Sequence, residues 1–579
     1  MKNFLKSTFS TFIALILFAF FCLFFIISSL SALSDIDIKK IDENSVLVLD
    51  LKNPILDRKS DNPFENLNAF NITPQSSIEM KELLDNIKNA KNNENIEGIY
   101  LNLSLVSAGF SQVEEIRNQL LDFKQSDKFI YAYSESFSQL GYYLASVSDK
   151  IYLNPEGSIM LNGISAGVMF YKDMLSKIGV EAQIIRHGKY KSAVEPFMYN
   201  EMSNENRNQL EKLLTSITNK MVLDISQSRG ISEIDINEAI NRLELTSSNY
   251  CKEMNFVDDL YYEDQVLDLI EDNVNSYSFI TYSEFLKSNK EESQDSDDKI
   301  AIIYATGPIN TGKGTFNTIG SITTVEAIRE AKEDDNIKAI VLRVNSPGGS
   351  ALASDIIWRE LNLAKLEKKI VVSMGDYAAS GGYYIACGAN KIFANVSTIT
   401  GSIGVFGVIP NTQELLNNKF GIHVDTVNTH TSADIFGGVR PLTIYEKSVF
   451  QREIGNVYET FLDRVSEGRS MNAEDVNEIA QGRVWSGEDA VLIGLVDEIG
   501  GLEDAIESAA LLADIDDYSI IKLPLKIDPI DELFEDILAE QKVAIAQELG
   551  LDQQFFNDFD VFNSKEVVQA KMPFIMKID

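Results

Sequence analysis

A serine with small neighbours stands out among the residues that could do chemistry. Ser380 lies in the run Ala-Ala-Ser-Gly-Gly-Tyr-Tyr, residues 378–384, between a predicted strand and a predicted helix. A hydroxyl at the start of a helix is close to free N–H groups, which favour developing negative charge. Small neighbours also let a substrate backbone approach. The segment therefore fits either a nucleophile or a serine that only caps the helix.

A second segment, residues 345–350, reads Asn-Ser-Pro-Gly-Gly-Ser and directly follows another predicted strand. Gly348 and Gly349 allow a tight turn that exposes backbone N–H groups. Paired donors of this kind suit an oxyanion hole, the set of N–H groups that stabilises a tetrahedral oxyanion. An ordinary strand-to-helix turn explains these residues equally well when they are taken alone.

A serine nucleophile needs a base, and the chain offers histidine or lysine for that role. Of the three histidines, His187 could act as the base, while nothing around His423 has the pattern of a Ser-His-Asp triad. Lysine can act as a base only when burial lowers its pKa. Lys191, in the run His-Gly-Lys-Tyr-Lys-Ser-Ala-Val-Glu-Pro-Phe of residues 187–197, is the candidate. Taken alone, this run also fits a loop with solvated lysines.

The elements that must position these residues occur twice along the chain. Three pairs of segments align at a constant offset of 241 residues, as in 342 − 101: 95–101 with 336–342, 141–145 with 382–386, and 150–154 with 391–395. An ordered series of this kind indicates an internal duplication. At this offset Ser380 aligns with Gln139, and Lys191 aligns with Ser432. The candidate nucleophile and the candidate base therefore belong to different copies.

Each copy alternates short apolar runs with amphipathic helix patterns. In the second copy the predicted strands are 300–304, 339–344, 370–373 and 391–394, and the predicted helices include 323–332 and 354–366. Short strands separated by helices of this length are typical of βαβ units. The sequence therefore predicts an α/β fold with a parallel sheet in each copy.

Charge and composition narrow the classes of function. The 579 residues include 51 Lys and Arg against 87 Asp and Glu, which gives a net charge of −36. Such a chain is a poor partner for nucleic acid, because phosphate contacts need a basic surface. The three His and three Cys show no spacing typical of metal ligands. We therefore predict neither a nucleic-acid partner nor a metal site.

The N-terminal segment predicts a membrane anchor. Residues 12–27 contain no polar side chain, and the uncharged stretch from 7 to 34 is long enough to span a bilayer. Lys2 and Lys6 precede the stretch, and Asp35 and Asp37 follow it. The positive-inside rule then leaves the short N-terminus in the cytoplasm and the remaining chain on the far side. The alternative is a cleaved signal peptide, although this apolar run is longer than usual for one.

Together the motifs resemble the long, two-domain form of signal peptide peptidase A, also called protease IV. The matching segments lie between about residues 10 and 515: 190–197, 345–349, 379–383, 399–404, 483–487 and 494–497. The resemblance implies tandem duplicated ClpP/crotonase-like α/β domains behind an N-terminal transmembrane helix. This sequence departs mildly from the family at Asp376 and Tyr377, where smaller residues are common, and in the tail beyond Leu523.

The resemblance also assigns roles to particular residues. It implies a Ser/Lys dyad in which Ser380 is the nucleophile and Lys191 the general base. Ser402, the family's second serine, would hydrogen-bond the lysine and orient it. The N–H donors for the oxyanion would come from the glycines of the two turns, namely Gly348, Gly349 and Gly381.

The function that the resemblance implies is that of a serine endopeptidase anchored in the membrane. It would degrade cleaved signal peptides and other apolar peptides through an acyl-enzyme, without a metal or an organic cofactor. It would cross the bacterial inner membrane once, keep the bulk of the chain on the periplasmic side, and assemble as a homo-tetramer. The alternatives are a catalytically inactive membrane scaffold and a crotonase-type acyl-CoA enzyme.

The predicted organisation has six parts. They are a cytoplasmic N-terminus (1–8), a transmembrane anchor (9–33), an N-terminal repeat domain with the lysine (44–285), a polar linker (286–298), a C-terminal repeat domain with the serine (299–523), and a helical acidic tail (524–579).

Overall fold

The computed structural model describes residues 13–15, 17–18, 21, 41–59, 77–274, 278–289, 296–524 and 568–572. The predicted anchor, residues 9–33, lies largely outside these ranges. Within them, no helix combines the length and the apolar character that crossing a membrane requires.

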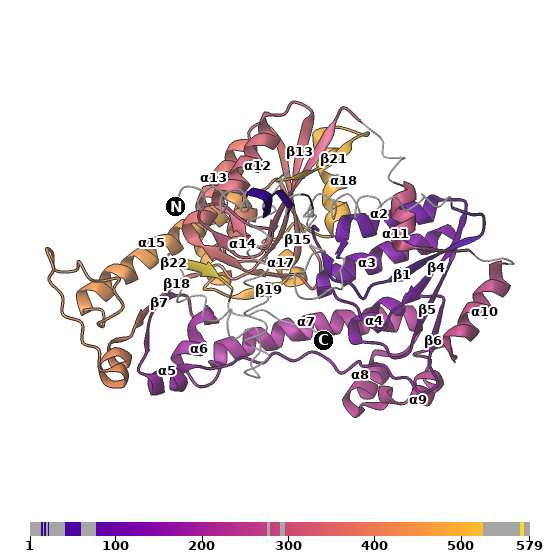
Figure 1. The fold of residues 1–579 in the computed structure, drawn as a ribbon, viewed down its shortest axis with the longest axis horizontal. Coiled ribbons are helices and arrows are strands. Elements are labelled where there is room, and N and C mark those ends of the chain that lie inside the picture. Colours follow the sequence, from indigo (N-terminus) through magenta and orange to yellow (C-terminus); the bar gives the residue numbers. More distant parts are fainter. Residues whose placement is uncertain are drawn as a thin grey trace.

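The first copy forms a six-stranded parallel sheet with helices on both faces (Figure 1). The strand order is β8-β6-β5-β4-β1-β9. The strands are β1 (Ser45–Asp50), β4 (Ile96–Asn102), β5 (Phe129–Ser134), β6 (Lys150–Leu153), β8 (Asp259–Leu260) and β9 (Ser278–Thr281). Helices α2 (Met80–Asn92), α3 (Phe110–Phe123) and α4 (Gln139–Ala145) pack on one face, and α10 (Glu263–Val274) packs on the other.

The second copy repeats this topology. Its strands are β10 (Lys299–Thr306), β13 (Ile337–Ser346), β15 (Lys369–Ala379), β16 (Lys391–Ala394), β17 (Ile399–Gly401), β19 (Val484–Ser486), β20 (Glu498–Ile499) and β21 (Ser519–Leu523). The order β21-β10-β13-β15-β16-β20 matches β9-β1-β4-β5-β6-β8 of the first copy. Helices α12 (Ser321–Glu333), α13 (Ala351–Ala364) and α14 (Gly381–Ala386) cover one face, and α18 (Leu502–Ala513) covers the other. The duplicated α/β architecture predicted from the sequence is confirmed.

The remaining elements connect and extend the two copies. Two helices of 26 residues each, α7 (Asn204–Arg229) and α15 (Ile444–Arg469), occupy corresponding places late in each copy. The shorter elements are β2 (Ile55–Leu56), β3 (Ile78–Glu79), α5 (Lys172–Ile178), α6 (Glu195–Met198), α8 (Glu233–Arg242), α9 (Ser248–Glu253), α11 (Tyr282–Asn289), α16 (Ala473–Ile479) and α17 (Gly487–Leu492).

A third sheet joins segments that lie far apart in the chain. Its order is β12-β11-β14-β22-β18-β7. The strands are β7 (Glu181–His187), β11 (Ile309–Asn310), β12 (Ile319–Gly320), β14 (Gly348–Ser350), β18 (Val405–Asn411) and β22 (Val568–Lys571). Strand β7 of the first copy pairs antiparallel with β18 of the second along its whole length. Figure 1 shows these two strands running together away from both lobes.

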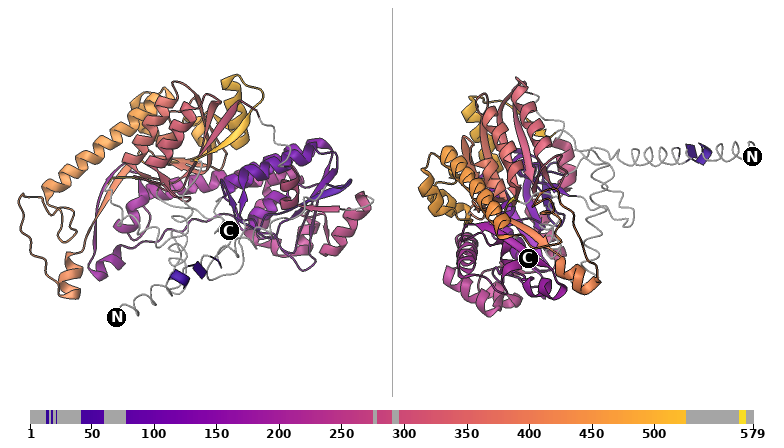
Figure 2. Two further views of the ribbon diagram at one scale, coloured as in Figure 1. Left: turned by 45° about the horizontal axis from the view of Figure 1, so that its top comes forward. Right: turned by 90° about the vertical axis from the view of Figure 1, so that its left-hand side faces the viewer.

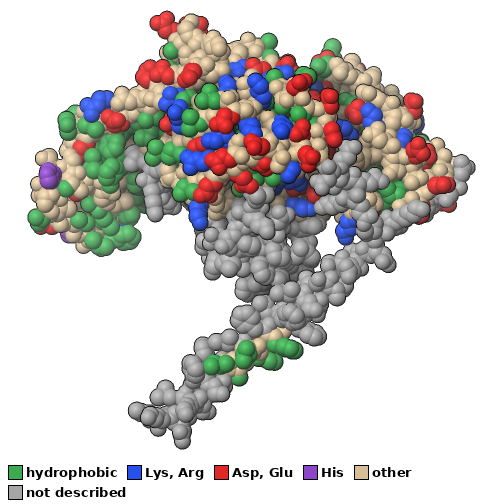
Figure 3. All heavy atoms as spheres, turned by 90° about the horizontal axis from the view of Figure 1, so that it is seen from above, with side chains coloured by type: hydrophobic (Ala, Val, Ile, Leu, Met, Phe, Trp, Pro, Cys, Tyr) green, Lys and Arg blue, Asp and Glu red, His purple; other side chains and the backbone are tan. Residues whose placement is uncertain are grey.

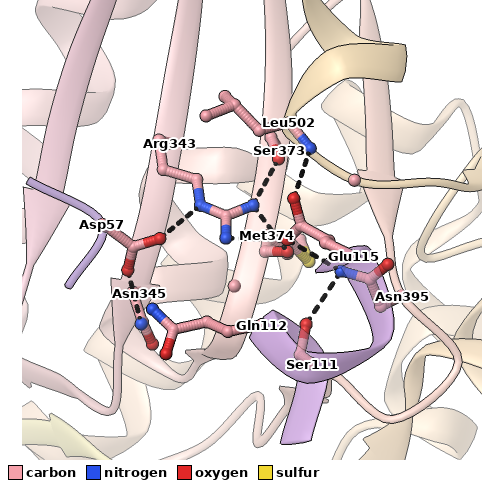
Figure 4. A network of polar contacts seen from close by, with 12 residues as sticks. Asp57, Ser111, Gln112, Glu115, Arg343, Asn345, Ser373, Met374, Asn395 and Leu502 are labelled. Atoms are coloured by element: carbon pink, nitrogen blue, oxygen red, sulfur yellow. Dashed lines mark hydrogen bonds and ion pairs between the residues drawn. The ribbon is translucent and has the colours of Figure 1, made fainter. Parts of the chain in front are cut away.

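A buried network of ion pairs and hydrogen bonds also links the two copies (Figure 4). Arg343 on β13 bonds Asp57 through Nε at 2.8 Å and Glu115 on α3 through Nη2 at 2.8 Å. Asn345 donates to the second oxygen of Asp57 at 2.6 Å, and Leu502 N donates to Glu115 at 2.8 Å. Since the two carboxylates come from the first copy and their partners from the second, the network holds the lobes in a defined relation.

The two copies form adjacent lobes, and an arm made of residues 412–443 projects from the second lobe (Figure 2). Acidic and basic side chains are interspersed over the lobes, whereas apolar side chains gather on the arm (Figure 3). The exposed apolar residues of the arm are Phe420, Ile422, Val424, Val427 and Phe436. Exposed apolar groups concentrated in one place are typical of an association surface.

Two segments differ from the sequence-based expectation. Helix α11 continues to Asn289, into the predicted linker of residues 286–298, because Phe285 is buried against the first lobe. The predicted helical tail, 524–579, lies mostly outside the described residues. Where it is described, Val568–Lys571 is a strand and not a helix. Its backbone pairs with strands on both sides, and such tertiary pairing overrides a local helical pattern.

Candidate active site

Strand β7 carries Lys191 from the first copy into the second. After the strand ends at His187, the chain turns at Gly188, which has a φ of +101°. A Cβ on Gly188 would lie 2.5 Å from the Gln481 carbonyl oxygen, and Tyr190 N donates to that oxygen at 2.9 Å. The turn is therefore docked directly on a loop of the second copy, and Lys191 follows it.

Ser380 lies at the junction of β15 and α14 in an unusual backbone conformation. Its φ of 57° and ψ of −113° are rare for a residue with a side chain. Strain of this kind costs about 1–3 kcal/mol and is typical of functional sites. Ser380 N donates to Gly401 O at 2.8 Å, which holds the turn in place. The hydroxyl makes no capping bond to α14, so the alternative of a simple helix cap does not apply.

Ser402 follows β17 and also has a positive φ, 50°. Its N–H donates to Arg483 O at 2.7 Å. This contact places the Ser402 side chain and carbonyl beside the turn that carries Lys191. Its hydroxyl lies 3.5 Å from Gly482 O, which can accept the hydroxyl proton.

The structure brings these three residues together within one chain. Lys191 Nζ lies 2.8 Å from Ser380 Oγ. It also lies 3.0 Å from both Ser402 O and Ser402 Oγ. All three residues are 0% exposed, so the solvated-loop alternative for Lys191 does not hold. Burial lowers the pKa of Lys191 well below its ordinary value of 10.5, because the charged ammonium loses its hydration.

Two glycines that the sequence reasoning missed enclose the lysine. A Cβ on Gly482 would lie 2.6 Å from Lys191 Cβ, and one on Gly404 would lie 3.3 Å from Lys191 Cδ. Gly404 ends the motif at 399–404, and Gly482 directly precedes the motif at 483–487, so both positions were visible in the sequence. Their contact with a residue more than 200 positions away was not.

The glycine turns predicted to supply N–H donors lie beside Ser380. Gly348 has a φ of +91°, and its N–H donates to Ser346 Oγ at 3.1 Å. That donor is therefore already engaged, and Gly348 contributes mainly its backbone conformation. The N atoms of Gly349 and Gly381 lie close to each other at these turns, since a Cβ on Gly381 would be 3.1 Å from Gly349 N and a Cβ on Gly348 would be 2.7 Å from Gly381 N.

Residues at the corresponding place in the first copy have structural roles. Gln139, which aligns with Ser380, accepts the N–H groups of Asn162 and Gly163 at 3.2 and 3.0 Å. Ser138 caps α4 by accepting from Gly141 N. His187, the alternative base, stacks on Tyr458 with ring centroids 4.1 Å apart. The nucleophile and base candidates therefore meet only in the second copy's site.

Comparison with known proteins agrees with this arrangement. Residues 122–276 and 362–516 each match peptidase family S49, and together they cover more than half of the chain. The chain belongs to peptidase family S49. It is a serine protease, and its resemblance to signal peptide peptidase A, or protease IV, is confirmed. The two matched ranges contain Lys191 and Ser380 respectively.

Relatives of this S49 protease span most of its length. Protease 4 of Salmonella typhi is 36% identical over 82% of this chain and 79% of its own. The chloroplastic serine protease SPPA of Arabidopsis thaliana is 33% identical over 93% of this chain and 79% of its own. A solved structure of a ClpP1 point mutant from Listeria monocytogenes aligns with 35% of this chain and 94% of its own at 17% identity. The TM-score of that alignment is 0.24.

Proposed function

We propose that this S49 protease is a membrane-anchored endopeptidase that degrades cleaved signal peptides with Ser380 as nucleophile and Lys191 as base. The observation that carries the proposal is the 2.8 Å separation of Lys191 Nζ and Ser380 Oγ in a fully buried site. A serine hydroxyl becomes a useful nucleophile only when a base within hydrogen-bond reach can take its proton.

The contacts of the amine fit its neutral form. A neutral lysine has two N–H donors and one lone pair. Ser402 O can only accept, and Ser402 Oγ can pass its own proton to Gly482 O and accept from the amine. Both N–H groups of Lys191 are then used on Ser402, which leaves the lone pair directed at the Ser380 hydroxyl. Ser402 is thus proposed as a positioning residue.

The reaction follows from this geometry. Ser380 Oγ attacks the peptide carbonyl carbon while its proton moves to Lys191 Nζ. The oxyanion accepts N–H groups from Gly349 and Gly381, which stabilises the tetrahedral state. The C–N bond then breaks, and the leaving amine takes the proton from Lys191. Water, deprotonated by Lys191, hydrolyses the remaining ester and regenerates the serine.

The membrane attachment and the substrate class are proposed together. The apolar N-terminal run would hold the enzyme at the bilayer, with the bulk of the chain on the periplasmic side, where released apolar signal peptides remain. A net charge of −36 opposes contact with anionic headgroups, so attachment would depend on that apolar run.

The parallel α/β copies and their glycine turns support a ClpP/crotonase-like classification. The exposed apolar arm supports self-association, proposed as a homo-tetramer.

The test is cleavage of a synthetic signal peptide by the purified full chain. We expect Ser380→Ala to lower kcat by on the order of 10⁶-fold and Lys191→Ala by about 10²–10⁴-fold. Lys189→Ala is the matched control, because Lys189 is exposed two residues from the base. Cleavage by either dyad variant at the rate of the control would contradict the proposal.

A further inference from the structure

The first copy has a cavity at the place that corresponds to the candidate active site of the second. Residues 104–109 align with the glycine turn 345–350, and residues 138–140 align with 379–381 around Ser380. The neighbouring strands recur as well, since β2 pairs parallel with β3 as β11 pairs parallel with β12. The first copy therefore retains the elements that form a peptide-binding cleft in the second.

This cavity lies between the two lobes, where α3 meets β15 (Figure 1). Its volume is about 520 Å³, within the range of roughly 300–1,000 Å³ that is typical of ligand sites. Leu105 is 56% exposed, so the cavity is accessible from solvent. Much of the lining is apolar and comes from both copies, including Ile55, Leu105, Leu140, Ile217, Tyr377 and Ile399.

The residues that would cut a peptide are absent from this cavity. Gln139 stands where the second copy has Ser380, and Leu140 stands where it has Gly381. The Gln139 side-chain oxygen is used to accept two backbone N–H groups. The cavity can therefore bind a peptide without cleaving it.

Asp376 brings a carboxylate into this apolar lining. One of its oxygens accepts Ser111 N at 2.9 Å and so caps α3. The other oxygen has no hydrogen-bond or ion-pair partner among the residues that the structure describes. A Cβ on Gly109 would lie 2.0 Å from that oxygen, so the carboxylate fits here only beside a glycine. Asp376 is also a position at which the sequence departs from the family.

The carboxylates beside the cavity outnumber the cations. Asp57 and Glu115 share the guanidinium of Arg343 through contacts of 2.8 Å. Burial and the nearby Asp57 raise the pKa of Asp376 to about 6, so its carboxyl group is mainly ionised at neutral pH. A buried carboxylate without a cation is costly, and a cationic group on a ligand would remove that cost.

We propose that this cavity is a second peptide-binding site, in which Asp376 binds the Lys or Arg side chain that borders an apolar peptide segment. The inference rests on the proposed function for its substrate class, since signal peptides join a basic segment to an apolar run of about 7–15 residues. Asp376 lies four residues before Ser380 (380 − 376), which is about 13 Å in an extended strand. An apolar run of that length in extended form spans this distance, so one substrate can occupy the cavity and the candidate active site together.

The experiment measures peptide binding to the full chain by fluorescence anisotropy at neutral pH, with Ser380→Ala present to prevent cleavage. Two labelled apolar peptides are compared, one with a lysine at its end and one with the neutral residue norleucine in its place. We expect the lysine peptide to bind about tenfold more tightly, as for a hydrogen bond to a charged group.

Two further substitutions in this background test the two parts of the cavity. Asp376→Asn should make the two peptides bind equally, while the amide oxygen still caps α3. Asp335→Asn is the matched control, because Asp335 is exposed, and it should keep the tenfold difference. Leu105→Ser should weaken both peptides by at least about threefold through lost apolar contact. Leu366→Ser is its control, since Leu366 is 81% exposed outside the cavity.

Cleavage of a synthetic signal peptide by chains that keep Ser380 separates this inference from the proposed function. Cleavage by a chain that binds the lysine and norleucine peptides equally overturns the second site and leaves the proposed function intact. A lysine preference that disappears with Asp376→Asn in a chain without cleavage supports the site and overturns the proposed function. A preference that survives Asp376→Asn, or an affinity that Leu105→Ser leaves unchanged, would overturn the second site.

Discussion

Lys191 is a lysine surrounded by neutral groups. Its amine contacts only hydroxyl and carbonyl oxygens among its described hydrogen-bond partners, and the lowering of its pKa comes from lost hydration alone. An ammonium in such a place is costly because no carboxylate compensates for the lost water. The site therefore favours the neutral amine, which is the form that can take a proton from Ser380.

The pH dependence of the reaction follows from that depressed pKa. Below this lowered pKa the amine of Lys191 is protonated and cannot act as a base. We therefore expect kcat/KM to rise as the pH passes through the pKa of Lys191. The plateau should be reached well below 10.5, the ordinary value for lysine. The measurement is a kcat/KM profile with a peptide substrate. A rate that rises only near the pKa of a solvated lysine would contradict this account.

The sequence identified the principal residues of the site but not the contacts that complete it. Ser380, Lys191 and Ser402 were visible because short motifs surround each of them. Gly482 and Gly404 act through the space they leave for a lysine that is distant in the chain, and the engagement of Gly348 N–H by Ser346 depends on the local turn. Such effects depend on tertiary geometry, which a motif does not contain.

At the scale of elements, the site depends on the pairing of β7 with β18. Seven residue pairs, from Val405 with His187 to Asn411 with Glu181, carry the lysine segment across to the second copy. The sequence predicted the parallel sheets because short apolar runs alternate with helical patterns along each copy. It did not predict this third sheet, because its short strands come from both copies and from the tail, and their register is set by long-range pairing.

The loop that receives the lysine offers a test at this scale. Gly482→Ala would place a Cβ 2.6 Å from Lys191 Cβ at a φ of +80°. We expect the lysine to shift and kcat to fall by about 10²-fold, as for a misplacement of about 1 Å. The measurement is kcat for cleavage of the synthetic signal peptide.

Gly230→Ala is the matched control for that variant. Gly230 also has a positive φ, +67°, but a Cβ there meets no atom within 4 Å. Both variants therefore bear the strain of a left-handed alanine, about 1–2 kcal/mol, and only Gly482→Ala disturbs the lysine. Equal activity of the two variants would show that Gly482 does not position Lys191.

At the scale of the whole molecule, the two copies must hold a fixed relation, since each supplies one member of the proposed dyad. The sequence showed that Lys191 and Ser380 fall in different copies, which predicted an interface without locating it. Arg343, Asp57 and Glu115 form its buried ionic centre. No spacing rule links these three residues, because they come from separate elements of both copies.

Arg343→Ala tests the contribution of this network. The variant leaves Asp57 and Glu115, whose side chains are 1% and 3% exposed, without their cation. We expect the free energy of unfolding to fall by about 3–5 kcal/mol, as when one partner of a buried ion pair is removed. Urea denaturation measures this free energy of unfolding. Arg242→Ala is the control, since Arg242 pairs with Glu238 at the surface, with side chains 66% and 57% exposed, and should matter little. A loss no larger than that of the control would contradict the role given to Arg343.

The most direct test of the proposed dyad is covalent labelling with an active-site-directed acylating probe, followed by peptide mass spectrometry. We expect the wild-type chain to carry one adduct, on Ser380. The labelling rate of Lys191→Ala should be lower by about 10²–10⁴-fold, because the base is absent, whereas Lys189→Ala should label like wild type. An adduct on a different residue, or equal labelling rates with and without Lys191, would contradict the assignment of Ser380 and Lys191.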